Sequence, residues 1–451
     1  MKVSTTDLHA DLMKEPRRTN PLSFLSKRVF ALAVLMLATT GVDAASNDCV
    51  CKYDPTVDYF PNKISPQYST NFQVEYFGSY KKLTTTDARG EKITTYAYLC
   101  GTPVPQGANV TNAIEIPIKS AAIVSTSFLP YIEYLGQRQS LHFVSAKPEN
   151  LKSCLRKMSD QGQVASGLLL DADSMRKANQ TAYSRTGEAL DVVFMDDYNL
   201  YNGVRDTMAQ VLGPRTKAIY LGEQLETTPM GKLEWVEVMA ALYNMEYAVL
   251  DIAIRLDARY NCVKDAVLAN PPAVKKKLTP EGMRDLVAQA DVWIYTDANW
   301  NRTSSYAPPF YEGSTMLEFK DLKPVANGEV YDILGSNFND WFEDAKAQPG
   351  VVLMDLVRVL YGNKYINSTT PRTFLRNVFN ETMASQAPRL ASECTNVSAP
   401  LYTEWHTGFC AVTNVTVVPN PNRVLCLGGS DATVAVPSML VVAVALVFAN
   451  W

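Results

Sequence analysis

The chain has 451 residues, of which 47% are hydrophobic and 20% charged, and its formal net charge is −4. This is the composition of a globular protein with enough chain for one large or two medium domains. It disfavours a nucleic-acid-binding function, because the basic run KKK at 275–277 is isolated and no basic stripe accompanies it.

Residues 1–44 are expected to be a secretory signal peptide. The basic pair KR precedes the apolar run VFALAVLMLA, and the small-residue site VDA at 42–44 follows that run. This order of basic, apolar and small residues predicts cleavage after Ala44 or Ala45. The long segment before the apolar run leaves two alternatives open, a signal anchor or a later start at Met13.

Cysteines and glycosylation sequons also favour the secretory pathway. All eight cysteines follow the signal, and an even number in a secreted chain predicts disulfide bonds. A zinc or thioredoxin-like site is disfavoured, because the sequence has no CxxC. Seven N-x-S/T sequons predict N-glycosylation. They lie at Asn109, Asn179, Asn301, Asn367, Asn380, Asn396 and Asn414.

Residues 45–226 are expected to form an N-terminal α/β lobe with an extension at its start. The alternating run FQVEYFGSY, the turn-like TTDARGEK and the run TTYAYLCG predict a β-hairpin. From about residue 113, strand-like runs alternate with helical ones. The strands are IEIPIKSAAIVS, LHFVSA, LDVVFMDD and KAIYLGE, and the helices are STSFLPYIEYLGQ and VRDTMAQVLG. This alternation predicts βα units around a mostly parallel sheet.

Residues 227–260 are predicted to form one long helix. Thr228 is a suitable N-cap, and Pro229 suits the first helical position. Apolar residues then recur at alternating spacings of three and four, which is the pattern of one helix face. They are Trp235, Val238, Leu242, Met245, Val249, Ile252 and Leu256. A helix of about 30 residues is about 45 Å long, which favours a spine between two lobes.

The remaining sequence predicts a second lobe and an appendage. Residues 261–363 are expected to form a C-terminal α/β lobe, from the helix–strand run MRDLVAQADVWIYTDANW, the helix–turn–strand run FKDLKPVANGEVYDI and the closing helix VVLMDLVRVLYG. Residues 364–430 hold four sequons and three cysteines with little periodicity, which indicates a glycosylated, disulfide-pinned stalk. The expected fold class is therefore α/β, with two lobes joined by one long helix.

Catalytic motifs are missing from the sequence. It contains no HExxH, GxSxG, P-loop or GxGxxG pattern, and only His142 and His406 follow the signal. A His-dependent triad or a His-rich metal site is therefore poorly supplied. Asp196 and Asp197 could hold a cation, but a helix cap is the favoured interpretation. The sequence predicts a protein that is not an enzyme and has no resident cofactor or metal.

Polar and aromatic residues follow several predicted strands. Ligands of open α/β sheets sit at the carboxyl ends of the strands, and aromatic groups with a few polar ones suit a bulky, partly apolar ligand. We therefore expect a ligand cleft between the lobes. Its candidate residues are Ser125, Thr126, Asp196, Tyr198, Glu223, Asn299, Trp300, Tyr311 and Trp341. For each residue taken singly, an ordinary cap or core role is the alternative.

The order of these elements resembles that of the class III substrate-binding proteins of ABC importers, whose lobes are joined by one long helix and which bind vitamin B12, haem or iron-siderophores. Their opening strand pair is similar to ARGEKITTYAY, and their first strand–helix–strand is similar to IPIKSAAIVSTSFLPYIEYLGQRQSLHFVS. Their second βα entry is similar to LDVVFMD, and their closing strand and helix are similar to DLKPVANGEVYDI and VVLMDLVRVLYG. The resemblance covers about residues 72–226 and 280–363.

Within that class, YLCGTPVP, LGEQLETTPMGKLEWVEVMAALYN and ADVWIYTDANW are similar to the algal cobalamin acquisition proteins. This resemblance implies capture of cobalamin for uptake, without catalysis, and delivery to an uptake receptor or transporter. One departure is that NPPAVKKKLTP holds no strand-like run, so the second lobe is expected to lack its first βα unit. Two alternatives stay open, an iron-siderophore or haem binder of the same fold and an adhesive or structural surface glycoprotein that has lost ligand binding.

The C-terminal segment has the pattern of a lipid-anchor signal. Gly428, Gly429 and Ser430 are small residues suited to attachment, and a spacer and an uncharged apolar tail follow them in residues 431–451. This arrangement predicts a GPI anchor, which replaces the tail and holds the protein at the outer face of the plasma membrane. The alternative is a single transmembrane span, since 20 residues are long enough, although Pro437 interrupts them and no basic residue follows.

Overall fold

The computed structural model describes residues 47–167, 171–268, 290–295, 321–335, 338–362, 372–381, 394–399 and 425–426. The chain divides into two compact units, and the larger one, Asp48–Cys426, holds nearly all of these residues. The expected signal peptide and lipid-anchor signal lie outside the described residues, together with the attachment residues Gly428, Gly429 and Ser430 and the sequons at Asn301, Asn367 and Asn414.

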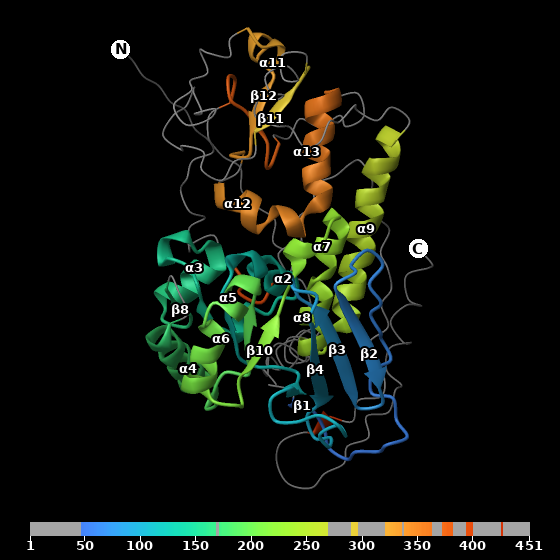
Figure 1. Cartoon of the computed structure of the whole chain (residues 1–451), viewed down its shortest axis with the longest axis vertical. Coiled ribbons are helices and arrows are strands. Elements are labelled where there is room, and N and C mark those ends of the chain that lie inside the picture. Colours follow the sequence, from blue (N-terminus) through green and yellow to red (C-terminus); the bar gives the residue numbers. More distant parts are fainter. Residues whose placement is uncertain are drawn as a thin grey trace, which may run out of the picture. The chain divides into compact units, whose positions relative to one another are not determined.

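The predicted hairpin is confirmed as part of a four-stranded sheet (Figure 1). In sheet order, its strands are β2 (Phe72–Phe77), β3 (Tyr80–Thr86), β4 (Lys92–Leu99) and β5 (Ala113–Ile116), with β5 parallel to β4 and the other pairs antiparallel. FQVEYFGSY is not a single strand, because the chain turns at Gly78 and Ser79 between β2 and β3. Burial alternates along β3, and Lys81, Leu83 and Thr85 face the core.

A five-stranded parallel sheet forms the centre of the first lobe. Its strands are β6 (Ala121–Ile123), β7 (Leu141–Val144), β8 (Ala165–Ser166), β9 (Val192–Met195) and β10 (Lys217–Tyr220), in the order β10-β9-β6-β7-β8. All residues of β6, β7 and β9 are buried, as is typical of parallel strands covered by helices on both faces. IEIPIKSAAIVS, expected to be one strand, contributes β5 to the first sheet and β6 to this one.

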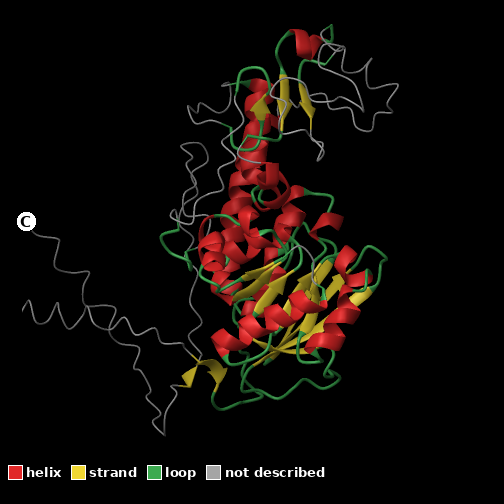
Figure 2. Cartoon of the chain, turned by 90° about the vertical axis from the view of Figure 1, so that its left-hand side faces the viewer, coloured by secondary structure: helices red, strands yellow, loops and turns green. Residues whose placement is uncertain are grey.

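Helices flank this parallel sheet (Figure 2). They include α2 (Leu129–Tyr134), α3 (Ser153–Asp160), α4 (Ala172–Thr186), α5 (Asp197–Tyr201) and α6 (Val204–Leu212). Helix α4 packs against α6, and α2 packs against α8 (Val236–Tyr243) of the following segment. Because β7 and β8 follow β6 on one side while β9 and β10 lie on the other, the direction of winding reverses between β6 and β9. That reversal is where open α/β sheets leave a crevice at their carboxyl edge.

The expectation of one unbroken helix over 227–260 is wrong for its first half. The chain forms α7 (Pro229–Glu234), α8 (Val236–Tyr243) and α9 (Glu246–Leu268). Thr228 caps α7 as expected, since its Oγ1 accepts from the Gly231 N–H at 3.0 Å. Asn244 ends α8 with φ of 56°, a left-handed conformation that asparagine tolerates better than most residues. The joining helix is therefore α9, which runs to Leu268.

The apolar stripe that suggested one helix is nevertheless in the core. Trp235, Val238, Leu242, Val249, Ile252 and Leu256 are buried, and Met245 packs against the same core at its edge. Burial of these residues follows from their apolar surface and does not require an unbroken backbone ladder. The expected fold class of two α/β lobes joined by a long helix is confirmed, with the helix shifted towards the C-terminus.

Two carboxylates of the α7 region hold the N-terminal extension. Glu234 accepts the backbone N–H groups of residues 67–69 at 2.6–2.8 Å. Glu226 accepts the backbone N–H groups of residues 70 and 71 and, at 3.1 Å, the indole N–H of Trp235. Both glutamates are buried, so these bonds replace the water that the carboxylates lose.

Glu237 in α8 gives the first lobe a dependence on pH. Burial raises the pKa of this carboxyl to about 8, with a further contribution from the charge of Glu234. The unfolded carboxyl ionises near pH 4.5, so unfolding releases a proton between about pH 4.5 and pH 8, and stability falls as pH rises through this window. We expect Glu237→Gln to remove that part of the pH dependence, which urea unfolding at pH 5 and pH 8.5 measures. A wild-type urea midpoint that is no lower at pH 8.5 than at pH 5 would contradict the expectation.

The second lobe is built on a three-stranded sheet within the described residues. Its strands are β11 (Trp293–Tyr295), β12 (Val330–Asp332) and β13 (Arg376–Asn377), and its helices are α11 (Lys323–Ala326), α12 (Phe338–Glu343) and α13 (Pro349–Tyr361). The expected turn at Gly328 is present with φ of 71°, and α13 is the expected closing helix, packed on α9. Residues 269–289, which bear on the expected loss of a βα unit, lie outside the described residues.

The expected disulfide-pinned stalk over 364–430 is tied to both lobes in the parts that the structure describes. Strand β13 completes the second lobe's sheet, antiparallel to β12. A disulfide joins Cys394 to Cys154 of α3, and β14 (Leu425–Cys426) pairs with β1 (Asn47–Val50). These segments are therefore integral to the larger unit.

The predicted use of cysteines is confirmed. A disulfide joins Cys49 to Cys100. Cys51 and Cys262 each take part in a disulfide as well, and no free cysteine occurs in the described part of the chain.

Candidate functional site

The carboxyl ends of β6 and β10 bring several predicted residues together. Ser125 and Ser127 hydroxyls lie 2.8 Å apart, and Ser127 donates to Glu223 Oε1 at 3.1 Å. Thr126, between the two serines, forms a side-chain hydrogen bond with Glu343 of α12. Strand-end residues of the first lobe thus meet α12 of the second lobe, and we call this meeting the seam.

Glu223 is the most deeply buried of the charged residues at the seam. It is 2% exposed, and its Oε1 also accepts from Lys346 Nζ at 2.5 Å. Its Oε2 is buried and has no hydrogen-bond partner among the described residues. A buried carboxylate oxygen without a donor is rare in proteins, so this atom is free to accept a hydrogen bond from a ligand or from water.

Further contacts cross the seam beside Glu223. Lys152, which precedes α3, lies 3.1 Å from Asp344 and 3.7 Å from Glu343. Burial raises the pKa of Glu343, and the charge of Lys152 opposes that rise. The Tyr134 hydroxyl donates to the Ala347 carbonyl at 2.6 Å. The lobes are therefore tied together at this edge by specific polar contacts.

Asp196 and Asp197 serve the local structure at the end of β9. Asp196 caps α5, since its Oδ1 accepts from Asn199 N at 2.9 Å, which confirms the helix-cap interpretation. Asp197 accepts from the Tyr220 hydroxyl and Gln224 Nε2, both at 2.9 Å, and from the backbone N–H of Ala88 at 3.1 Å.

The β3–β4 turn therefore reaches the carboxyl edge of the parallel sheet, which the sequence did not predict. Arg89 of this turn lies over the Tyr201 ring, 3.5 Å from its centroid. The charged tip DARG is the one sequence feature that could have suggested a contact. Tyr198, beside this turn, is 66% exposed, so it is available at the edge.

Of the remaining predicted residues, the structure describes only Trp341, which lies in α12. Trp341 packs against the core of the second lobe, with its ring 6.2 Å from that of Phe374. Asn299, Trp300 and Tyr311 lie outside the described residues.

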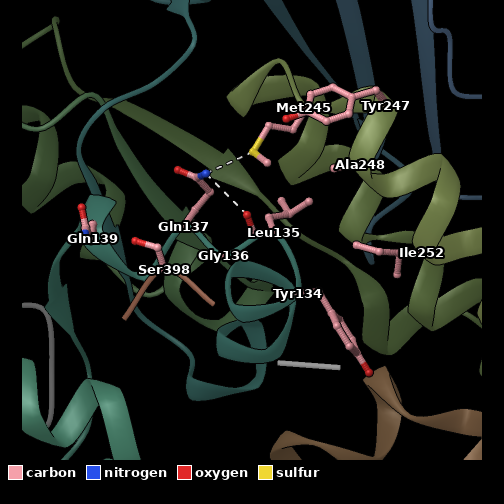
Figure 3. A pocket seen from close by; sticks show the side chains of 10 residues that line it. All are labelled: Tyr134, Leu135, Gly136, Gln137, Gln139, Met245, Tyr247, Ala248, Ile252 and Ser398. Carbon is pink, nitrogen blue, oxygen red and sulfur yellow. Dashed lines mark hydrogen bonds between the residues drawn. The ribbon is translucent and has the colours of Figure 1, made fainter. Parts of the chain in front are cut away.

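A cavity of about 430 Å³ lies at another place in the first lobe (Figure 3). It is bounded by the loop 135–139, by the first turns of α9 and by Ser398, and none of the residues lining it is charged or was predicted as a site residue. Because this loop leads into β7, the cavity lies towards the amino end of that strand rather than at the carboxyl edge.

The described residues hold no cluster of three or more acidic, histidine or cysteine side chains suited to a metal ion. His142 in β7 is a core residue, and burial lowers the pKa of its imidazole to about 4. None of the described helices is long and apolar enough to cross a membrane.

Comparisons with known proteins found similar folds only among solved structures. No protein-family model matches the chain, and no curated protein matches it. A TroA-like periplasmic binding protein, FepB from Veillonella parvula, is 11% identical with a TM-score of 0.38, over 63% of this chain and 92% of that one. The petrobactin-binding protein YclQ from Bacillus subtilis is 13% identical with a TM-score of 0.38, over 62% and 97%. A periplasmic heme binding protein from Pseudomonas aeruginosa is 12% identical with a TM-score of 0.34, over 59% and 99%. In the part of the chain that the structure describes, the protein is a mixed α/β protein, with one five-stranded parallel sheet, two mixed sheets of three and four strands, and the two-stranded pairing of β1 with β14.

Proposed function

We propose that this chain is a cell-surface binding protein that captures cobalamin at the seam between its lobes, for delivery to an uptake receptor or transporter and without chemistry on the ligand. The observation that carries the proposal is the enclosed Oε2 of Glu223, which has no donor within the described structure. It lies where the carboxyl ends of the parallel strands meet the second lobe, the usual ligand position in open α/β sheets.

The chemistry of Glu223 favours a ligand that donates hydrogen bonds. The ion pair with Lys346 at Oε1 already balances the charge of the carboxylate. A neutral donor therefore suits Oε2 better than a second cation. The corrin ring of cobalamin carries carboxamide side chains, whose N–H groups are such donors. Haem presents carboxylates, which a buried glutamate repels. A ferric siderophore with amide groups remains the alternative ligand of this site.

Calorimetry of the purified larger unit tests the ligand, with cyanocobalamin, haemin and a ferric hydroxamate siderophore compared side by side. We expect cyanocobalamin to bind most tightly of the three. No measurable heat, or a millimolar Kd, would overturn cobalamin capture. Tighter binding of the siderophore would move the proposal to iron uptake.

Glu223→Gln tests the place of binding. Lys346 retains the amide oxygen of the new side chain, so its NH2 group takes the position of Oε2 and opposes a donor on the ligand. We expect affinity for cyanocobalamin to fall about 10- to 100-fold, the value of a hydrogen bond to a charged group. Glu188→Gln is the matched control, because Glu188 is exposed and pairs with Arg215 on the surface. Equal affinity of Glu223→Gln and wild type, with unchanged melting temperature, would exclude the seam as the site.

A second candidate function is an adhesive or structural surface glycoprotein without a small-molecule ligand. It is favoured by the polar contacts that hold the seam together, those of Lys152 with Asp344 and of Tyr134 with the Ala347 carbonyl. This function predicts no binding of any of the three ligands by the folded protein, together with retention of the protein on cells.

The attachment to the cell surface is part of the proposal. The disulfides Cys49–Cys100 and Cys154–Cys394 support an oxidising, extracytoplasmic compartment. We expect phosphatidylinositol-specific phospholipase C to release the protein from intact cells, as a GPI anchor would allow. Release by detergent but not by the phospholipase would indicate the alternative, a transmembrane span.

A further inference from the structure

The cavity beside α9 has the chemistry of a site for a neutral, polar ligand. It is open to solvent and is lined by Gln137 and Gln139 on one side and by Met245, Tyr247 and Ile252 on the other (Figure 3). Its volume, about 430 Å³, falls within the range of about 300–1,000 Å³ typical of small-molecule sites. Amides opposite an aromatic and aliphatic wall suit a sugar, which has hydroxyl edges and apolar ring faces.

One polar group of the cavity is poorly used by the protein itself. Gln137 Nε2 donates to the Leu135 carbonyl at 3.4 Å and to the thioether sulfur of Met245 at 3.1 Å. The first bond is long, and a thioether is a weak acceptor. This amide can therefore turn to a better acceptor at little cost. Tyr247 on the facing wall is 45% exposed, which leaves its ring free to stack.

A glycosylation sequon borders the same cavity. Ser398, which lines the cavity, is the third residue of the sequon Asn396-Val397-Ser398. Asn396 is exposed, and its Oδ1 accepts from the Ser398 N–H at 2.9 Å, so the backbone is folded tightly between them. The acceptor asparagine thus lies only two residues from the cavity wall.

This sequon is held rigidly against the first lobe. Arg138 donates to the carbonyls of Val397 and Ala399 at 3.1 and 2.6 Å. The Cys154–Cys394 disulfide holds the chain just before it. A sugar linked to Asn396 would therefore start from a fixed point next to the cavity and lose little chain entropy on entering it.

We propose that this cavity is a saccharide subsite occupied by the first sugars of the N-glycan on Asn396. The acetamido and hydroxyl groups pair with Gln137 and Gln139, and an apolar ring face packs on Tyr247. The glycan then joins segment 394–399 to the start of α9, as a covalently attached part of the first lobe. The proposal rests on passage through the secretory pathway and is independent of cobalamin capture.

Hydrogen exchange of glycosylated and unglycosylated protein tests the proposal. In protein secreted by eukaryotic cells, we expect Asn396→Gln to raise amide exchange in residues 135–139 and 245–252 and to lower Tm by about 2–4 °C. The same substitution in protein from a bacterial periplasm, which carries no such glycan, is expected to change neither. Tyr247→Ala in the glycosylated protein should reproduce the faster exchange while the glycan stays attached.

Thr111→Ala is the matched control, because it removes the exposed sequon at Asn109 and leaves the asparagine in place. It should leave exchange around the cavity unchanged. Glycopeptide mapping separates the outcomes. A glycan at Asn109 with none at Asn396 would overturn the proposal while leaving the secretory route intact. An occupied Asn396 whose removal leaves exchange unchanged would also overturn it.

Discussion

Replacing Lys81 by methionine is expected to lower the free energy of unfolding by about 3–5 kcal/mol, the cost of removing one partner of a buried ion pair. The Lys81 side chain is fully buried in β3 and lies 2.5 Å from Glu246 Oε1, and Glu246 is itself 4% exposed at the start of α9. Lys81 also donates to the Ala241 carbonyl at 2.8 Å and to Asn244 Oδ1 at 3.0 Å. The substitution would leave the buried Glu246 carboxylate, the buried Ala241 carbonyl and the half-buried Asn244 side chain without this donor.

Urea unfolding followed by circular dichroism measures the effect, and the neighbouring residue supplies the control. Lys82 pairs with Glu75 at 2.9 Å, but both side chains are more than 30% exposed. Lys82→Met should therefore cost much less than Lys81→Met, because exposed ion pairs contribute little to stability. The double variant Lys81→Met/Glu246→Gln should recover part of the loss, because it removes the stranded charge. Equal effects of Lys81→Met and Lys82→Met would contradict this account.

Replacing both Cys154 and Cys394 by alanine is expected to cost about 5 kcal/mol. The disulfide closes a loop of 240 residues, and in the chain-entropy model the stabilisation grows with the logarithm of loop length. It also positions the segment whose carbonyls receive the bonds of Arg138. We expect a lower urea midpoint and faster proteolysis near residue 394.

The Cys49–Cys100 disulfide is the internal comparison for this prediction. Its loop of 51 residues is shorter, so the same model gives about 4 kcal/mol for its removal. Both double variants should fold under oxidising conditions with the remaining disulfides intact. A smaller loss for Cys154/Cys394 than for Cys49/Cys100 would show that loop entropy is not the dominant contribution.

Local patterns predicted the elements whose burial is set by their own residues. The strands of the parallel sheet are short, continuous apolar runs, and these are buried on both faces in the structure. The break at Asn244 was missed, because the apolar spacing continues across it and only the backbone conformation changes. The roles of residues 372–381 and 394–399 were missed, because their contacts are made with residues far away in the sequence. Asp355, for instance, accepts from the backbone N–H groups of residues 373–375.

The candidate site was predictable only where local sequence order determines it. Thr126 and Glu223 follow the carboxyl ends of β6 and β10, and in a parallel sheet these ends lie at the same edge. The partners that reach them, Lys346 and Glu343, come from a distant segment with no local signal. The β3–β4 turn at Asp197 likewise depends on how two sheets pack, which periodicity within either sheet does not encode.

Two outer strands of the sheets are short, which has a consequence for contacts between copies of the chain. Strand β8 closes one side of the parallel sheet with only two residues, and β13 closes the second lobe's sheet with two. An exposed strand edge is a template for pairing with another molecule, and its hazard grows with the length of the unpaired backbone. Edges this short offer a neighbour few free backbone groups. These two edges therefore contribute little to backbone pairing between copies of the chain.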